Sequence, residues 1–177
     1  RFNNLEAGSF SETTTASFGV DFVVGAEDGA ASEATSFGYQ MGIGLSTSFT
    51  GEDSLDVAID IGDGVSGALA FDDTDDVMTV DGLTYTFPVG GATVLVGDST
   101  DVSALYTGAC AYSSFTDYMG NCGTGSTVGV GGSGVTAAMS YAFDSGFSLA
   151  GGVSSENDDI LTEEGTDIYG IEAAYSA

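Results

Sequence analysis

The sequence predicts an all-β protein: about eight strands of an antiparallel transmembrane β-barrel, forming part of a larger barrel, in a single domain over residues 1–177. Three observations predict this fold class. Apolar and small or polar residues alternate with a period of two in segment after segment. The clearest of these segments reaches the about 9 to 11 residues that a tilted strand needs to cross a bilayer. The links between successive strands are alternately tight and long, as they are in outer-membrane barrels.

The composition limits what the chain can do. Twenty-seven acidic residues stand against one basic residue, Arg1, with no Lys and no His, so the formal net charge is −26. Nucleic acid is excluded as a partner, because neutralising phosphates requires Lys and Arg. Yet 42% of the residues are hydrophobic, so charge and apolar surface have to be separated in space. No run of 18 apolar residues occurs, and any crossing of a membrane would therefore use strands.

The first three strands are predicted at Thr14 to Val24, Ser36 to Thr50 and Leu55 to Ile61. Each has one apolar face, and the acidic residues within these strands fall on the other face. A charge on the lipid side of a barrel is unfavourable, so clean apolar faces are what a membrane strand requires. The apolar face of the first two strands comprises Ala16, Phe18, Val20, Phe22, Val24, Phe37, Tyr39, Met41, Ile43, Leu45 and Phe49.

The fourth and fifth strands, Leu83 to Phe87 and Ala92 to Val96, are shorter, and Asp81-Gly82 could form a hairpin turn of its own. The last three alternate clearly. They are predicted at Val135 to Phe143, Phe147 to Val153 and Tyr169 to Tyr175.

The links are expected to be tight at Gly51 to Asp53, Pro88 to Gly91 and Asp144 to Gly146. Seventeen of the 27 acidic residues lie in the other four links, which are expected to be long and to face outward. These are Gly25 to Thr35, Asp63 to Asp81, Asp98 to Ser133 and Glu156 to Gly165.

The polar face of the strands has two interpretations. Its larger polar residues could line a water-filled pore that favours cations, since charged side chains set ion preference. Alternatively, its Gly, Ala and Ser residues could pack inside a small closed barrel, although buried acids would then lack basic partners. We favour the water-filled interior. The candidate pore-lining residues are Asp21, Gln40, Asp56, Asp60 and Glu172.

The chain lacks the residues that most catalytic mechanisms require. Without His there is no Ser-His-Asp triad and no His-based zinc site, and without Lys there is no Schiff base and no Walker A loop. We therefore predict that the chain is not an enzyme and needs no cofactor. The acidic run Asp72, Asp73, Asp75 and Asp76 could bind Ca²⁺ through oxygen ligands, but it lacks EF-hand spacing, and a solvated acidic loop is the favoured reading.

The longest link, Asp98 to Ser133, contains both cysteines, Cys110 and Cys122, which could form a disulfide in an oxidising compartment. Its apolar residues from Val102 to Met119 have approximately helical spacing. Long links are often functional. This one either folds back into the lumen to narrow a pore or packs on itself outside, and the sequence leaves both open.

Four segments of the chain are RFNNLEAGSFSETTT at residues 1–15, TSFTGEDSL at 47–55, LTYTFPVGGATVLVG at 83–97 and YAFDSGFSLAGG at 141–152. They resemble marine cyanobacterial porins of the carbohydrate-selective group, which are often labelled iron uptake porins. The resemblance runs over nearly the whole chain, and its most specific parts are the FPVGG turn and the Cys-containing link. It implies an outer-membrane location and a passive channel for sugars, inorganic ions or iron, without choosing among these solutes.

Full members of this group have further regions, and we expect this chain to be the N-terminal part of such a barrel. It starts without a signal peptide, which we attribute to processing or to a partial sequence. A homotrimer is expected by analogy alone. The rival reading from another class is an exported, acidic structural or adhesive β-protein that binds calcium.

Overall fold

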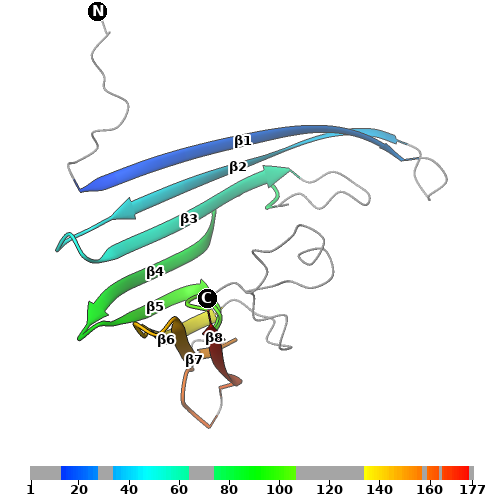
Figure 1. Cartoon of the computed structure of the whole chain (residues 1–177). Helices are drawn as coiled ribbons and strands as arrows, with labels where there is room; N and C mark the ends of the chain where they lie inside the picture. Colours follow the sequence, from blue (N-terminus) through cyan, green and yellow to red (C-terminus); the bar gives the residue numbers. More distant parts are fainter. Residues whose placement is uncertain are drawn as a thin grey trace, which may run out of the picture. The chain divides into compact units, whose positions relative to one another are not determined.

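The structure, a computed structural model, describes residues 13–27, 34–63, 74–106, 134–156, 159–163 and 165–175. Over these residues the fold is all-β, with eight strands in one antiparallel sheet in which each strand neighbours the next along the chain (Figure 1). The strands are β1 (Thr14–Glu27), β2 (Ala34–Thr47), β3 (Ser54–Asp63), β4 (Thr79–Val89), β5 (Ala92–Thr100), β6 (Gly134–Ala142), β7 (Phe147–Ser155) and β8 (Asp167–Tyr175).

The chain divides into two compact units, which we describe separately. The first unit comprises Arg1–Thr47 and Asp56–Asp81, and the second comprises Ser48–Leu55 and Gly82–Ala177. In the sheet of described strands, β1 and β8 stand at the two ends of the order, so the sheet is open there. A helix with the length and apolarity needed to cross a membrane is absent from the described residues.

All eight predicted strands are confirmed, but some of their bounds differ. The first strand continues to Glu27 and the second begins at Ala34 and ends at Thr47, three residues before its predicted end. The alternative turn at Asp81-Gly82 is wrong, because both residues lie inside β4. A period of two predicts that a strand is present better than it predicts where the strand ends, since turn residues can continue the alternation.

The expected alternation of tight and long links holds from β3 onward and fails before it. Six residues join β1 to β2 and six join β2 to β3, so these two links are equally long. The link between β4 and β5 is only Gly90-Gly91, with φ angles of 57° and 90°. Two consecutive residues with positive φ form the turn whose twist matches a two-residue hairpin, and glycine adopts that conformation at little cost. Pro88 lies in β4 opposite Thr93, not in the turn.

Among the described residues, the buried side chains lie in the second unit, and most of them are small. Leu95, Ala138 and Ala150 are 5–6% exposed, and the hydroxyl residues Thr136 and Ser154 are buried more deeply still. Among the described residues of the first unit, only glycines are buried to this degree. Among the described residues, Leu95 and Val102 are the only buried apolar side chains larger than alanine, so the described strands enclose few large apolar side chains.

Candidate functional site

The strand register sorts the side chains of the sheet onto two faces. Between β1 and β2, Phe18 lies opposite Ile43 and Val20 opposite Met41. The intervening pair joins Gly19 to Gly42, and small or polar partners continue along that face. Because residues directly opposite each other share a face, the pairing assembles one apolar face and one small or polar face.

The second unit repeats this separation over four strands. Tyr141 of β6 lies opposite both Ala92 of β5 and Leu149 of β7, and Leu149 lies opposite Ala173 of β8. The apolar face is therefore continuous from β5 to β8. The other face pairs small residues, such as Ala138 with Gly152.

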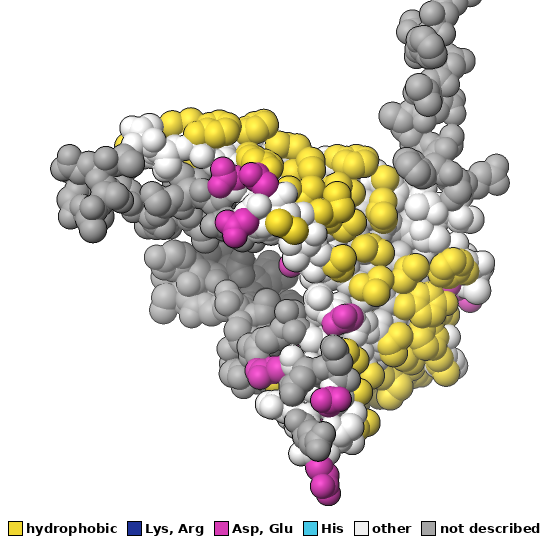
Figure 2. Space-filling model, turned by 180° about the vertical axis from the view of Figure 1, so that it is seen from behind, with side chains coloured by type: hydrophobic (Ala, Val, Ile, Leu, Met, Phe, Trp, Pro, Cys, Tyr) yellow, Lys and Arg dark blue, Asp and Glu magenta, His cyan; other side chains and the backbone are white. Residues whose placement is uncertain are grey.

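The apolar face is the exposed one. In the first unit Phe18, Phe22 and Val24 are each 68–70% exposed, and in the second unit Ile171 is 84% exposed. Figure 2 shows hydrophobic side chains gathered over the strands. In the second unit this burial is the reverse of that in a water-soluble sheet, because the large apolar side chains are exposed and the small residues Thr136, Ala138 and Ser154 are buried. The other large hydrophobic side chains exposed on this face are Val20, Phe37, Leu83, Val89, Val96, Met139, Tyr141, Phe147, Leu149, Tyr169 and Tyr175.

Aromatic side chains form contacts near the ends of the strands. In the second unit these contacts lie at the end with the shorter links, and the closest pair, Phe147 and Tyr175, has ring centroids 4.7 Å apart. In the first unit Phe22 stacks on Phe37 near the link between β1 and β2. Aromatic side chains are typical of membrane–water interfaces. The remaining contacts in the second unit join Phe49 to Tyr85, Tyr85 to Phe87 and Tyr141 to Phe143.

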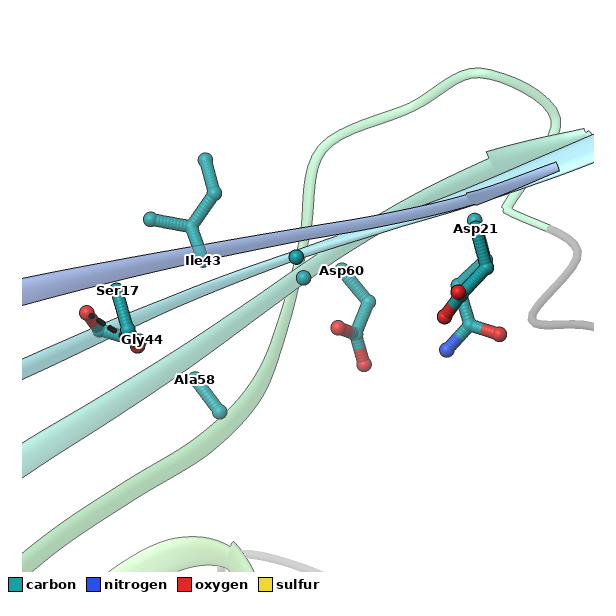
Figure 3. Close-up of a pocket in the computed structure, with 9 residues that line it drawn as sticks. Ser17, Asp21, Ile43, Gly44, Ala58 and Asp60 are labelled. Atoms are coloured by element: carbon teal, nitrogen blue, oxygen red, sulfur yellow. Dashed lines mark hydrogen bonds between the residues drawn. The ribbon is translucent and has the colours of Figure 1, made fainter.

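A hollow of about 300 Å³ opens on the polar face of the first unit. It brings together three of the five predicted pore-lining residues: Asp21 of β1, Gln40 of β2 and Asp60 of β3. Figure 3 shows Asp21 and Asp60 on the same side of the strands, with Ile43 pointing to the opposite side. The hollow is therefore an open, acidic surface on the small-residue face.

Glycines keep this hollow open. A Cβ at Gly42 would lie 3.4 Å from a carboxylate oxygen of Asp60, and a Cβ at Gly44 would lie 2.6 Å from the Ser17 hydroxyl. At Gly19 no atom lies within 4 Å of the position of a Cβ. Side chains at these positions would fill space that the glycines leave to water. The hollow is lined by Ser17, Gly19, Asp21, Gln40, Gly42, Ile43, Gly44, Ala58 and Asp60.

The other two predicted pore-lining residues lie elsewhere. Asp56 is on β3, four residues before Asp60, so the pleat of the strand places it on the same face as Asp60. Glu172 lies on β8 in the second unit, opposite Ala150 on the polar face. Both side chains are partly exposed.

The predicted disulfide, Cys110 with Cys122, lies outside the described residues, as do Asp72 and Asp73 of the acidic run. Asp75 and Asp76 are described and form a turn with positive φ angles of 53° and 62°. A carboxylate oxygen of Asp76 accepts a hydrogen bond of 2.6 Å from the Tyr39 hydroxyl. The described part of the chain holds no group of three or more acidic residues arranged to bind a metal ion.

Sequence reasoning missed Asp53, which organises the link between β2 and β3. One carboxylate oxygen accepts hydrogen bonds from the backbone N–H groups of Phe49 and Thr50 and from the hydroxyls of Ser48 and Thr50. The other accepts one of 2.7 Å from the Tyr85 hydroxyl of β4. These bonds, led by that from the Thr50 backbone, hold the pKa of Asp53 well below its usual value. Ser48 and Thr50 shortly before an Asp are a turn signal that could have suggested the local part of this network.

No known protein family's sequence model matches the chain, and no curated protein matches it in sequence. The site is therefore defined by its own geometry: an exposed apolar face, an opposite face of small and acidic residues, and aromatic contacts near the strand ends.

Proposed function

We propose that this chain forms part of an outer-membrane porin, a passive water-filled channel for small hydrophilic solutes such as sugars and inorganic ions, iron among them. In this proposal the apolar face contacts lipid, and the polar face, with Asp21, Gln40 and Asp60, contacts water and favours cations. No catalytic step, metal or other cofactor is required. A homotrimer in the outer membrane stays part of the prediction.

The observation that carries the proposal is the outward apolar face. Moving a side chain such as Phe22 or Ile171 from water to an apolar medium stabilises by about 1.5–3 kcal/mol. Monomeric soluble proteins rarely expose more than a few hundred Å² of continuous apolar surface. Lipid hydrocarbon is a medium that can contact such a face over several strands at once. The strands, of 9 to 14 residues, are long enough to span it.

The open sheet sets a condition on the proposal. Unpaired backbone groups in hydrocarbon cost several kcal/mol each, so a sheet in lipid has to close on itself. The free edges of β1 and β8 would therefore pair with each other or, as we expect for one part of a larger barrel, with further strands.

The test is a matched pair of substitutions on neighbouring residues of β1 in the full-length parent protein. Val20→Arg places a charge on the apolar face, and we expect it to disfavour membrane insertion by about 2–4 kcal/mol. Gly19→Arg places the same charge on the opposite face, where no atom lies within 4 Å of a Cβ. We expect this variant to insert normally and to lower the cation preference, because the new charge stands in the hollow with Asp21.

Insertion is measured as folding yield in lipid vesicles, and ion preference as the reversal potential in a planar bilayer under a KCl gradient. Stepwise currents that favour cations in the parent protein would support the proposal. Equal loss of insertion in both variants would mean that the faces are wrongly assigned. A parent protein that stays soluble without detergent and never conducts would favour the exported, calcium-binding β-protein instead.

A further inference from the structure

In the second unit, the apolar face ends in carboxylates where β5 and β7 finish. Asp98, two residues before the end of β5, lies opposite Leu83 of β4, which is 40% exposed on the apolar face. Asp167 is the first residue of β8, and Tyr169, two residues further along the same face, is 67% exposed. Both carboxylates therefore lie on the outward side of the sheet. The predicted strands were too short to include these two residues.

In the first unit, the link after β3 supplies a third carboxylate. The backbone N–H of Asp76 donates a 3.1 Å hydrogen bond to the carbonyl of Gly62, next to the end of β3. The side chain of Asp76 accepts the 2.6 Å bond from the Tyr39 hydroxyl, and Tyr39 lies opposite Phe22 on the apolar face. Asp76 itself is exposed. We call Asp76, Asp98 and Asp167 the acidic rim.

Local hydrogen bonds hold the rim carboxylates of the second unit in place. The carboxylate of Asp98 accepts a 2.7 Å bond from the N–H of Ser99. That of Asp167 accepts bonds of 3.1 Å from the N–H of Leu161 and one of 3.2 Å from the Tyr169 hydroxyl. A charge on the lipid side of a barrel is tolerated near the interface and costly in hydrocarbon. Lipid hydrocarbon that contacts the apolar face has to end at the rim, and the rim then lies among headgroups.

The opposite ends of the strands place their carboxylates differently. Asp53 is 7% exposed, and its two oxygens accept hydrogen bonds from the β2–β3 link and from Tyr85, so it is not available to a headgroup. Glu52 and Asp144 are exposed there, but they lie in links and not on the face of a strand. The rim therefore belongs to the ends at which β3, β5 and β7 finish.

The protein has almost no cation of its own to place beside the rim. Its only basic residue is Arg1, against 27 acidic residues. Membrane proteins bind anionic lipids through Lys and Arg near the membrane surface, at about 1 kcal/mol for each, and carboxylates in that position repel the same lipids. A zwitterionic headgroup instead presents an ammonium group, and a carboxylate can pair with it. The complementary partner of the rim is therefore a lipid whose headgroup carries a cation.

We propose that the acidic rim is a headgroup-binding border of the apolar face, which selects lipids with an ammonium group and disfavours anionic lipids. This inference rests on the proposed contact between the apolar face and lipid. It adds the chemistry of the lipid and the residues that contact its headgroup.

The experiment compares vesicles of phosphatidylcholine and phosphatidylglycerol, whose headgroups share a phosphate and differ in the ammonium group. Folding equilibrium constants of the full-length protein are measured by urea titration at low ionic strength with a chelator. We expect the constant of the parent to be roughly tenfold or more higher in phosphatidylcholine. The rim variant Asp76→Asn/Asp98→Asn/Asp167→Asn keeps side-chain oxygens that accept hydrogen bonds, and its constants should agree within about twofold.

The matched control is Asp21→Asn/Asp56→Asn/Asp60→Asn, which removes three charges from the polar face and should keep the lipid preference of the parent. If the rim variant does not fold, Asp98→Asn alone should lower the preference by about a third on a logarithmic scale.

Equal constants for the parent in the two lipids, or equal loss of preference in the rim and control variants, would overturn the rim and leave the porin proposal standing. A parent that folds in either lipid only after Mg²⁺ is added would overturn the ammonium assignment and favour phosphates bridged by the ion. A parent that enters neither vesicle and stays soluble would overturn the porin proposal as well.

Discussion

The polar faces of the two units differ in the size and charge of their side chains. In the first unit the face carries Asp21, Gln40 and Asp60 around an open hollow. In the second unit the corresponding face on β6 and β7 carries Thr136 and Ser154, both buried. The period-two pattern is the same in both units. Alternation decides which face a residue occupies, whereas what packs against that face decides whether water reaches it. In the second unit Val102, in the link after β5, lies against Gly170 of β8 and is fully buried.

The largest expected effect tests this difference with the same substitution in both units. Gly152→Val in β7 should destabilise the fold by about 1–3 kcal/mol, because a Cβ there would lie 2.7 Å from the Ala137 carbonyl and 2.9 Å from the Ala138 Cβ. Gly19→Val in β1 meets no atom within 4 Å and should change stability by less than about 0.5 kcal/mol. Urea unfolding of the protein in lipid vesicles measures both. Similar losses for the two variants would mean that the two faces are equally packed.

A smaller effect should distinguish the hydroxyl pairs of the two units. The Thr136 hydroxyl lies 2.8 Å from that of Ser154 and also bonds to the Thr100 carbonyl, in a buried position. Thr136→Val removes both bonds from a buried position and should cost about 1–2 kcal/mol. The Thr47 hydroxyl donates to that of Thr14 at 2.9 Å, but both residues are partly exposed, so water can replace the bond.

We therefore expect Thr47→Val to cost only a few tenths of a kcal/mol, on the order of 0.3 kcal/mol. The same urea titration applies. The double variant Thr136→Val/Ser154→Val should recover part of the loss, because it removes an unpaired hydroxyl together with its former partner. No recovery would indicate that the loss comes from shape and not from hydrogen bonding.

The smallest effect at neutral pH concerns Asp53. Asp53→Asn keeps a side-chain oxygen that can accept the bonds from Ser48, Phe49 and Thr50, so the turn should persist. The pKa of Asp53 is lowered in the folded protein, so its stabilising contribution is present above the unfolded value near 3.8 and is lost as the pH falls below it. Urea midpoints of the parent should therefore fall between about pH 5 and about pH 3 more steeply than those of Asp53→Asn. Parallel curves would remove Asp53 from the acid response.

The existence and order of the eight strands could be predicted from the sequence, because the alternation is local and can be read from each segment without knowing which strands pair with it. It also placed Asp21, Gln40 and Asp60 on one face, and the register brings them into one hollow. It could not identify the partner of Asp53, because Tyr85 lies 32 residues away and the contact depends on how the strands are arranged.

The sequence left open whether the link after β5 folds back into the lumen or packs on itself outside. The course of its first residues depends on the register shift between Gly97 and Thr100, and Val102 packs on Gly170, which looks in the sequence like any other glycine of an alternating strand. The apolar residues Val102, Leu105 and Tyr106 had suggested helical spacing, but the described residues 102–105 form a turn. The rest of that predicted pattern lies outside the described residues.

The turn at Gly90-Gly91 has a consequence for the order in which the sheet assembles. Two residues join β4 to β5, whereas residues 101–133 separate β5 from β6. The free-energy cost of loop closure is about 2 kcal/mol higher for the longer connection, since each doubling of length adds about 0.6 kcal/mol. We therefore expect the β4–β5 hairpin to form early in folding, and β6 to pair with β5 later.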